Sequence, residues 1–212
     1  MKVLVIGIDG GNWRVLRREI SHLRTLRKII KLGSYGVLRS TVPPVTLPAW
    51  PSMITGCNPA KHGVVGFTDK YLRPKSFKDL KKMTFWEILG FKGYKSLIVN
   101  VPMTYPPRPL NGVLIPGMGM PQENIKTYPK ELLEFLKEIR YIVEAPVNVV
   151  RRLSTSYAAL KELLNIEKVH TEVFLDLNDR GNFDLGFIVY RATDIVQHMV
   201  WSQKHKILNT YR

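Results

Sequence analysis

The stretch Val3-Leu4-Val5-Ile6-Gly7-Ile8-Asp9-Gly10-Gly11 decides the fold class. From Lys2 to Ile8 the chain is almost unbroken in its apolar character and rich in β-branched residues. Such a run predicts a buried strand of a parallel sheet, and the Asp-Gly-Gly that follows predicts a loop at the strand's carboxyl end. Asp9 is therefore expected at the sheet edge where open α/β folds bind their ligands.

Further apolar runs predict two more buried strands and several helices around this first strand. Residues 96–99, ending at Asn100, and residues 184–190 have the composition of buried strands. Residues 34–40 alternate like a strand. Helical spacing of apolar residues predicts helices ending at Gly33, beginning near Thr46 or Pro48, and over residues 85–89, 129–139, 154–179 and 193–209. The alternation of strands and helices predicts an α/β fold, a mostly parallel sheet with helices on both faces.

The length suits a single domain over residues 1–212 that carries one insertion. From Pro102 to Pro121 the composition changes to proline, glycine and methionine, with neither a helical nor a strand period. This change predicts a long functional loop or the start of an inserted cap, at about residues 102–150.

Cysteine content and hydropathy limit the compartment and the kind of metal site. The single cysteine, Cys57, excludes an internal disulfide framework and a zinc cluster of several thiolates. The first apolar run is too short for a signal-peptide core, and no later run is long enough to span a bilayer. A cytoplasmic protein without a membrane partner is expected, and any metal must be held by carboxylates, imidazoles or hydroxyls.

The chain is strongly basic, with 32 Lys and Arg against 17 Asp and Glu and a formal charge of +15. Such a charge attracts polyanions and steers small phosphorylated substrates, so nucleic acid stays open as a partner. Much of the charge alternates with leucine and isoleucine at helical spacing between residues 16 and 31. That spacing favours a solvated helix face over a nucleic-acid surface.

Three short motifs carry residues suited to phosphate chemistry, although each has a plain structural explanation when taken alone. Asp9 suits a metal carboxylate but also fits a tight Asp-Gly-Gly turn. Thr46, in Pro-Pro-Val-Thr-Leu-Pro, is expected at a helix N-terminus, where free N–H groups favour a phosphate, but it also fits an ordinary N-cap. Asp194 and His198 are four residues apart, which places both on one helix face as metal ligands or as a surface ion pair.

Together the motifs resemble a known family. Val5-Ile6-Gly7-Ile8-Asp9-Gly10, then Thr46-Leu47-Pro48-Ala49-Trp50-Pro51-Ser52-Met53-Ile54-Thr55-Gly56 with Pro59 and His62-Gly63-Val64, and finally Asp194 to His198 are similar in type and order to the type I phosphodiesterase/nucleotide pyrophosphatase group of the alkaline phosphatase superfamily. The resemblance runs from residue 1 to about residue 205. It implies an alkaline phosphatase-like α/β fold.

The resemblance also implies a two-metal site, usually zinc, with manganese as the alternative. Asp9 and Thr46 would bind one cation, and Asp194 and His198 would help to bind the other. Paired cations would lower the pKa of the Thr46 hydroxyl and orient the phosphoryl group for attack. The expected activity is hydrolysis of phosphodiesters, pyrophosphates or phosphomonoesters through a phosphothreonine intermediate, with a small phosphorylated substrate such as a nucleotide.

Two departures from the family pattern refine this expectation. Gly66-Phe67-Thr68 stands where nucleotide pyrophosphatases carry a phosphate-binding Asn, which favours another substrate than a nucleotide diester. The family's remaining ligands, an Asp-His pair and a further His, are not found before Arg212. A fold that is incomplete at its C-terminus and weak metal binding are therefore expected. The expected partner is a second copy of the chain or a missing C-terminal half. A non-catalytic basic domain that binds nucleic acid or a protein partner stays open as the alternative function.

Overall fold

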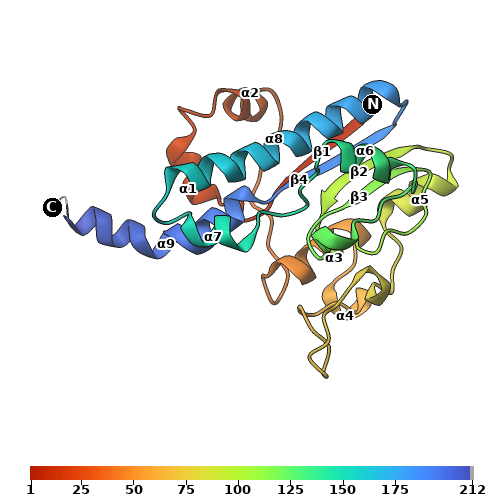
Figure 1. The fold of residues 1–212 in the computed structure, drawn as a ribbon, viewed down its shortest axis with the longest axis horizontal. Coiled ribbons are helices and arrows are strands. Elements are labelled where there is room, and N and C mark those ends of the chain that lie inside the picture. Colours follow the sequence, from red (N-terminus) through yellow and green to blue (C-terminus); the bar gives the residue numbers. More distant parts are fainter. Residues whose placement is uncertain (211–212) are drawn as a thin grey trace.

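The computed structural model describes residues 1–210, with side chains described as far as Trp201. Within these residues one parallel sheet has the strand order β1 (Val3–Ile8), β4 (Leu185–Tyr190), β2 (Ser96–Val101) and β3 (Gly112–Pro116) (Figure 1). The predicted α/β fold with a mostly parallel sheet is confirmed.

The strands are connected by helices of very different length. The helices are α1 (Trp13–Glu19), α2 (Arg24–Leu32), α3 (Thr46–Thr55), α4 (Pro59–His62), α5 (Phe85–Phe91), α6 (Leu132–Glu138), α7 (Val147–Arg152), α8 (Tyr157–Arg180) and α9 (Ala192–Thr210), with short 3₁₀ turns at Phe77–Asp79 and Gln122–Asn124. No helix in the described part of the chain is both long enough and apolar enough to cross a bilayer.

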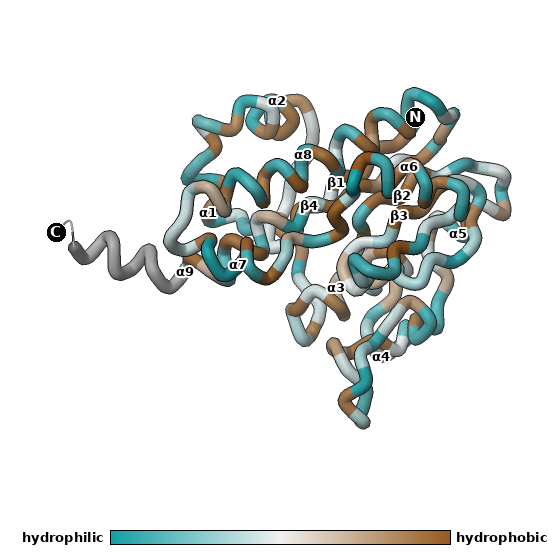
Figure 2. Tube along the Cα trace, in the orientation of Figure 1, coloured by the Kyte–Doolittle hydropathy of each residue, from teal (hydrophilic) through white to brown (hydrophobic). Residues whose placement is uncertain are grey.

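Helices cover both faces of the sheet because side chains alternate between the faces along each strand. On one face, Ile98 and Phe187 pack with Trp50 of α3 and Trp86 of α5. On the other face, the strand residues Leu97, Val99 and Ile188 pack with α6 and α8 through Leu136, Val173 and Phe174. Figure 2 shows the hydrophobic residues gathered along the strands. The prediction of helices on both faces is confirmed.

The N-cap of α8 lies one or two residues later in the sequence than predicted. Ser156 is the N-cap, and its Oγ accepts a hydrogen bond from the backbone N–H of Ala159 at 3.3 Å. The predicted caps Ser154 and Thr155 are instead part of the turn before it. The predicted end before Gly181 is confirmed.

The prediction that the first strand is buried is wrong. β1 is parallel as expected, but Val3, Leu4 and Ile6 are 52–54% exposed, and Gly7 is its one buried residue. The reason is the position of β1 at the edge of the described sheet, where it is hydrogen-bonded to β4 alone. Neither α1 nor α2 buries a residue of its own, so these helices do not form a layer over the strand.

Two other local predictions are corrected by the strand pairing. Residues 34–40 form no strand and are exposed, because no described strand lies beside them to complete a ladder. The strand β3 lies inside the stretch from Pro102 to Pro121 that was predicted to lack a period. It forms because five residues pair with β2, from Ser96↔Gly112 onward.

Candidate functional site

The polar cluster lies at the carboxyl edge of the sheet, where β1 and β4 end side by side. Ile8 pairs with Tyr190, and the backbone N–H of Asp9 donates to the Tyr190 carbonyl at 2.9 Å. Asp9 and Arg191 are therefore neighbours, each one residue beyond its strand. α9 begins at Ala192, so its first two turns stand over the same edge.

Asp9 is buried, and each of its carboxylate oxygens already accepts a hydrogen bond. Oδ1 accepts from the indole Nε1 of Trp50 at 3.1 Å, and Oδ2 accepts from Nε of Arg191 at 3.2 Å. The backbone carbonyl of Asp9 accepts from the hydroxyl of Thr193 at 2.7 Å. A buried carboxylate with this many partners is held in one orientation.

The turn after Asp9 allows α9 to approach closely. Gly10 has φ +69°, and a Cβ atom there would lie 2.8 Å from Cα of Asp194. Only glycine adopts this conformation and leaves this space without strain. The Asp-Gly-Gly turn therefore lets α9 pack close enough to place Asp194 beside Asp9.

The guanidinium of Arg191 joins three carboxylates from three parts of the chain. It bonds Asp9 as described, it pairs closely with Glu144 through Nη1, and its Nη2 is 3.7 Å from Oδ2 of Asp194. The backbone N–H groups of Arg191 and Ala192 both donate to Oε1 of Glu167, at 2.8 and 2.6 Å. These bonds fix the strand-to-helix junction.

Asp194 and His198 lie on one face of α9 as the spacing predicts. His198 Nε2 is 3.4 Å from Oδ1 of Asp194, while the imidazole is 77% exposed to solvent. Burial raises the pKa of the Asp194 carboxyl, and repulsion from Asp9 raises it further, whereas His198 and Arg191 act in the opposite direction. The carboxylates of Asp9 and Asp194 therefore repel each other.

Thr46 is the first residue of α3, which confirms the predicted helix start. Val45 before it is extended, so Thr46 lies in the first turn of α3, where the backbone N–H groups have no partner within the helix. Trp50 lies four residues later on the same face and bonds Asp9. The helix that carries Thr46 is thus tied to the carboxylate cluster one turn away.

His62 supports this helix and is not free to bind a metal. It is fully buried, Nε2 is 2.9 Å from Oγ of Ser52 in α3, and Nδ1 accepts from the backbone N–H of Val64 at 3.2 Å. An accepting Nδ1 indicates the neutral tautomer that carries its proton on Nε2. Burial lowers the pKa of His62, which agrees with a neutral ring.

A second buried histidine, His170 of α8, positions the loop that carries Glu144. Its Nε2 is 2.7 Å from the Ile142 carbonyl, and its Nδ1 is 3.3 Å from Nδ2 of Asn100, the residue predicted to end the second buried strand. Asn100 has φ +59°, and its Nδ2 also donates to the Val189 carbonyl at 2.8 Å. Strand ends and the loop are thereby joined in one hydrogen-bonded network.

Of the predicted site residues, the structure brings Asp9, Asp194 and His198 into one cluster, and it connects Thr46 to that cluster through Trp50. Within the described side chains, no three of the His, Cys, Asp and Glu residues are already arranged as a metal cage. Arg191 and Glu144 were not predicted as site residues. Arg191 follows a strand end next to Asp194, a signal that was present, whereas Glu144 is brought in only by tertiary packing.

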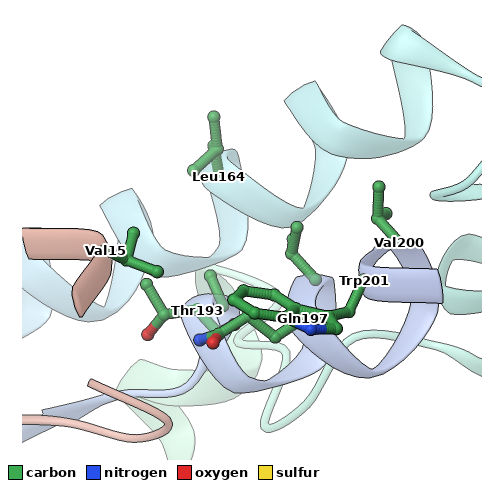
Figure 3. A pocket seen from close by; sticks show the side chains of 8 residues that line it. Val15, Leu164, Thr193, Gln197, Val200 and Trp201 are labelled. Atoms are coloured by element: carbon green, nitrogen blue, oxygen red, sulfur yellow. The ribbon is translucent and has the colours of Figure 1, made fainter. Parts of the chain in front are cut away.

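A separate apolar cavity of about 330 Å³ lies between α1, α8 and α9 (Figure 3). Its lining is Val15, Leu164, Ala192, Thr193, Val196, Gln197, Val200 and Trp201. It contains none of the carboxylates, and Gln197 and Thr193 turn their polar ends to the backbone of the Asp9-Gly10 turn. The cavity is therefore separate from the carboxylate cluster.

Comparison with known proteins gives one match. The family model described as type I phosphodiesterase / nucleotide pyrophosphatase matches residues 3–212. No curated protein and no solved structure matches the chain.

Proposed function

Since the chain belongs to the type I phosphodiesterase/nucleotide pyrophosphatase family, we propose that it hydrolyses phosphoric esters with Thr46 as the nucleophile and divalent metals bound at the carboxylate cluster. Membership of the family makes it a phosphoesterase in general terms. The metal site and the roles of single residues are our proposal. The observation that carries them is the bond from Trp50 to Asp9, which ties the helix of Thr46 to a buried carboxylate.

The donor set suits zinc or manganese. Asp9 and Asp194 offer carboxylates, His198 offers an exposed imidazole, and Thr46 offers a hydroxyl. Repulsion between the two carboxylates supports a cation between them, because a positive charge would relieve it. Two cations bound there would lower the pKa of the Thr46 hydroxyl and neutralise charge on the phosphoryl oxygens.

In the proposed reaction, Thr46 Oγ forms a bond to phosphorus as the bond to the leaving oxygen breaks. The hydroxyl proton passes to solvent. The N-terminus of α3 favours the negative phosphoryl group through its free N–H groups and its dipole. Water then attacks phosphorus, the Thr46–phosphorus bond breaks, and the hydroxyl is restored.

The substrate that fits this proposal is a small phosphorylated molecule. The net charge of +15 would steer it towards the site. Because Gly66-Phe67-Thr68 lacks the family's phosphate-binding Asn, we expect aryl and alkyl phosphate esters to be better substrates than nucleotide diesters. The alternative, a basic binding domain, rests on net charge alone, whereas the buried Asp9 cluster supports an enzyme.

Two further parts of the proposal concern the inserted region and the partners. We propose that the inserted region at about residues 102–150 acts as the cap of the site, since its Glu144 pairs with Arg191. We also propose that the chain self-associates through β1. Among the described residues this strand is hydrogen-bonded on one side only, and its apolar side chains are exposed, which is the usual basis of edge-to-edge pairing.

The test compares Thr46→Ala and Thr46→Ser with the unsubstituted chain, using aryl phosphomonoesters and diesters in added zinc or manganese. Thr46→Ala should abolish turnover, and Thr46→Ser should retain part of it. Thr55→Ala is the matched control, because it removes a threonine hydroxyl from the last residue of the same helix. Full turnover by Thr46→Ala would show that another group is the nucleophile.

A further inference from the structure

The guanidinium of Arg191 lies among the carboxylates of the proposed metal site. The side chain of Arg191 is 11% exposed, and its guanidinium lies against Asp9, Glu144 and Asp194. Buried arginine is stable only when its donors are paired, and here three carboxylates share them. One guanidinium among three carboxylates leaves the cluster negative in a chain whose formal charge is +15.

Each carboxylate oxygen of Asp9 already accepts one hydrogen bond, and each keeps a second lone pair that can bind a cation. Trp50 donates to Oδ1 and Arg191 donates to Oδ2. A divalent cation that binds Asp9 would lie close to the positive guanidinium of Arg191, whose Nε is 3.2 Å from Oδ2, and the two would repel each other. The neutral indole of Trp50 does not repel a cation, so the guanidinium is the group that has to move away from Asp9.

Glu144 is the partner that can keep the guanidinium afterwards. It pairs with Nη1, on the opposite side of the guanidinium from the Nε that bonds Asp9. The Glu144 side chain is 36% exposed, and it belongs to the loop between α6 and α7 rather than to a strand end. The backbone of Arg191 stays fixed by Glu167, so a change of partner requires only a side-chain movement.

We propose that Arg191 is an internal counter-cation: it holds Asp9 and Asp194 in the metal-free protein, yields Asp9 to an incoming divalent cation, and stays on Glu144. This inference rests on the proposed metal site. Arg191 is then a positioning residue that competes with metal, while Glu144 promotes metal binding by drawing the guanidinium away. Opposite effects of the two residues are the signature of this arrangement.

Calorimetric titration of the protein with zinc and with manganese tests the proposal. Arg191→Gln should bind the first cation about tenfold more tightly than the unsubstituted protein, a size typical of coupling between sites. Glu144→Gln should bind it more weakly, because the guanidinium then has only Asp9 and Asp194 as partners. Arg180→Gln is the control, since Arg180 pairs with Asp176 on the exposed surface of α8 and its loss removes the same formal charge.

Thermal unfolding in chelator gives a second readout that does not depend on activity. Arg191→Gln should melt at a lower temperature than the unsubstituted protein without metal, and added zinc should raise its melting temperature by more. If Arg191→Gln does not fold, the weaker binding of Glu144→Gln still decides the matter. Equal metal affinity in all variants, or weaker binding by Arg191→Gln, would overturn the proposed role of Arg191 but leave the proposed metal site standing. If no variant bound metal, both the role of Arg191 and the metal site would be overturned.

Discussion

The bond from Trp50 to Asp9 makes a quantitative prediction about stability. Trp50→Phe removes the indole N–H, and Oδ1 of Asp9 loses its donor at 3.1 Å while remaining buried. A hydrogen bond to a charged group contributes about 1.5–3 kcal/mol to the free energy of unfolding, more than a bond between neutral groups. The smaller ring also leaves a void, whose cost has to be separated from that of the bond.

Trp86→Phe separates the two costs. Trp86 packs in the same core cluster and is more deeply buried than Trp50, but its indole bonds no carboxylate within the described residues. The void therefore costs at least as much at Trp86. Trp50→Phe should nevertheless lower the free energy of unfolding by about 1.5–3 kcal/mol more. For a chain of this size, this corresponds to a difference of about 3–12 °C in melting temperature.

The assay is thermal and urea unfolding of both variants in chelator, so that metal does not contribute. The transition would be followed by far-ultraviolet circular dichroism, which reports helix content, and by near-ultraviolet circular dichroism, which reports tertiary packing. If Trp50→Phe were no less stable than Trp86→Phe, the bond between α3 and Asp9 would contribute nothing, and the link between Thr46 and the carboxylate cluster would lose its support.

Three shorter predictions follow from the same structure. Burial lowers the pKa of His62 in the folded state, so below about pH 6.5 the unfolded chain binds more protons than the folded chain. The free energy of unfolding should therefore decrease as the pH falls below this value. Denaturant titrations of His62→Gln should show a smaller decrease. The pKa of Asp194 is raised by burial and by Asp9, so its ionised form opposes folding near neutral pH. Asp194→Asn should therefore melt at a higher temperature in chelator and should bind zinc more weakly in calorimetry. A lower melting temperature would contradict the repulsion between Asp194 and Asp9. Ile6→Lys on the edge strand β1 should reduce self-association measured by sedimentation velocity. Leu72→Lys, which also replaces an exposed apolar residue by lysine but lies in a turn, should not.

The strand–helix order was predictable because apolar runs and helical spacing are local signals. β4 and the helix that carries Asp194 and His198 follow from one stretch of sequence, and their pairing with β1 explains why Asp9 lies beside them. Burial was not predictable for β1, because an apolar strand has the same composition at the edge and in the centre of a sheet. β3 was missed because its five residues pair with β2 over a short connection rich in proline.

Within the site, prediction succeeded for residues that lie at strand and helix ends and failed for those brought in by packing. Glu144 follows no local pattern, and its place depends on His170 holding the Ile142 carbonyl. Trp50 resembles any core aromatic in sequence, since only the fold turns its indole N–H towards Asp9. Arg191 directly follows a predicted strand in the sequence. That it contacts three carboxylates could be known only from the tertiary structure.

The most direct test of the proposed function is to trap the covalent intermediate. The chain would be mixed with an aryl phosphate ester and zinc, quenched in acid before turnover is complete, digested, and analysed by mass spectrometry. The account predicts that the phosphoryl group is attached to Thr46, in the peptide that contains the start of α3, and that Thr46→Ala carries none. Release of the aryl alcohol with the phosphoryl group on another residue, or equal release by Thr46→Ala, would contradict it.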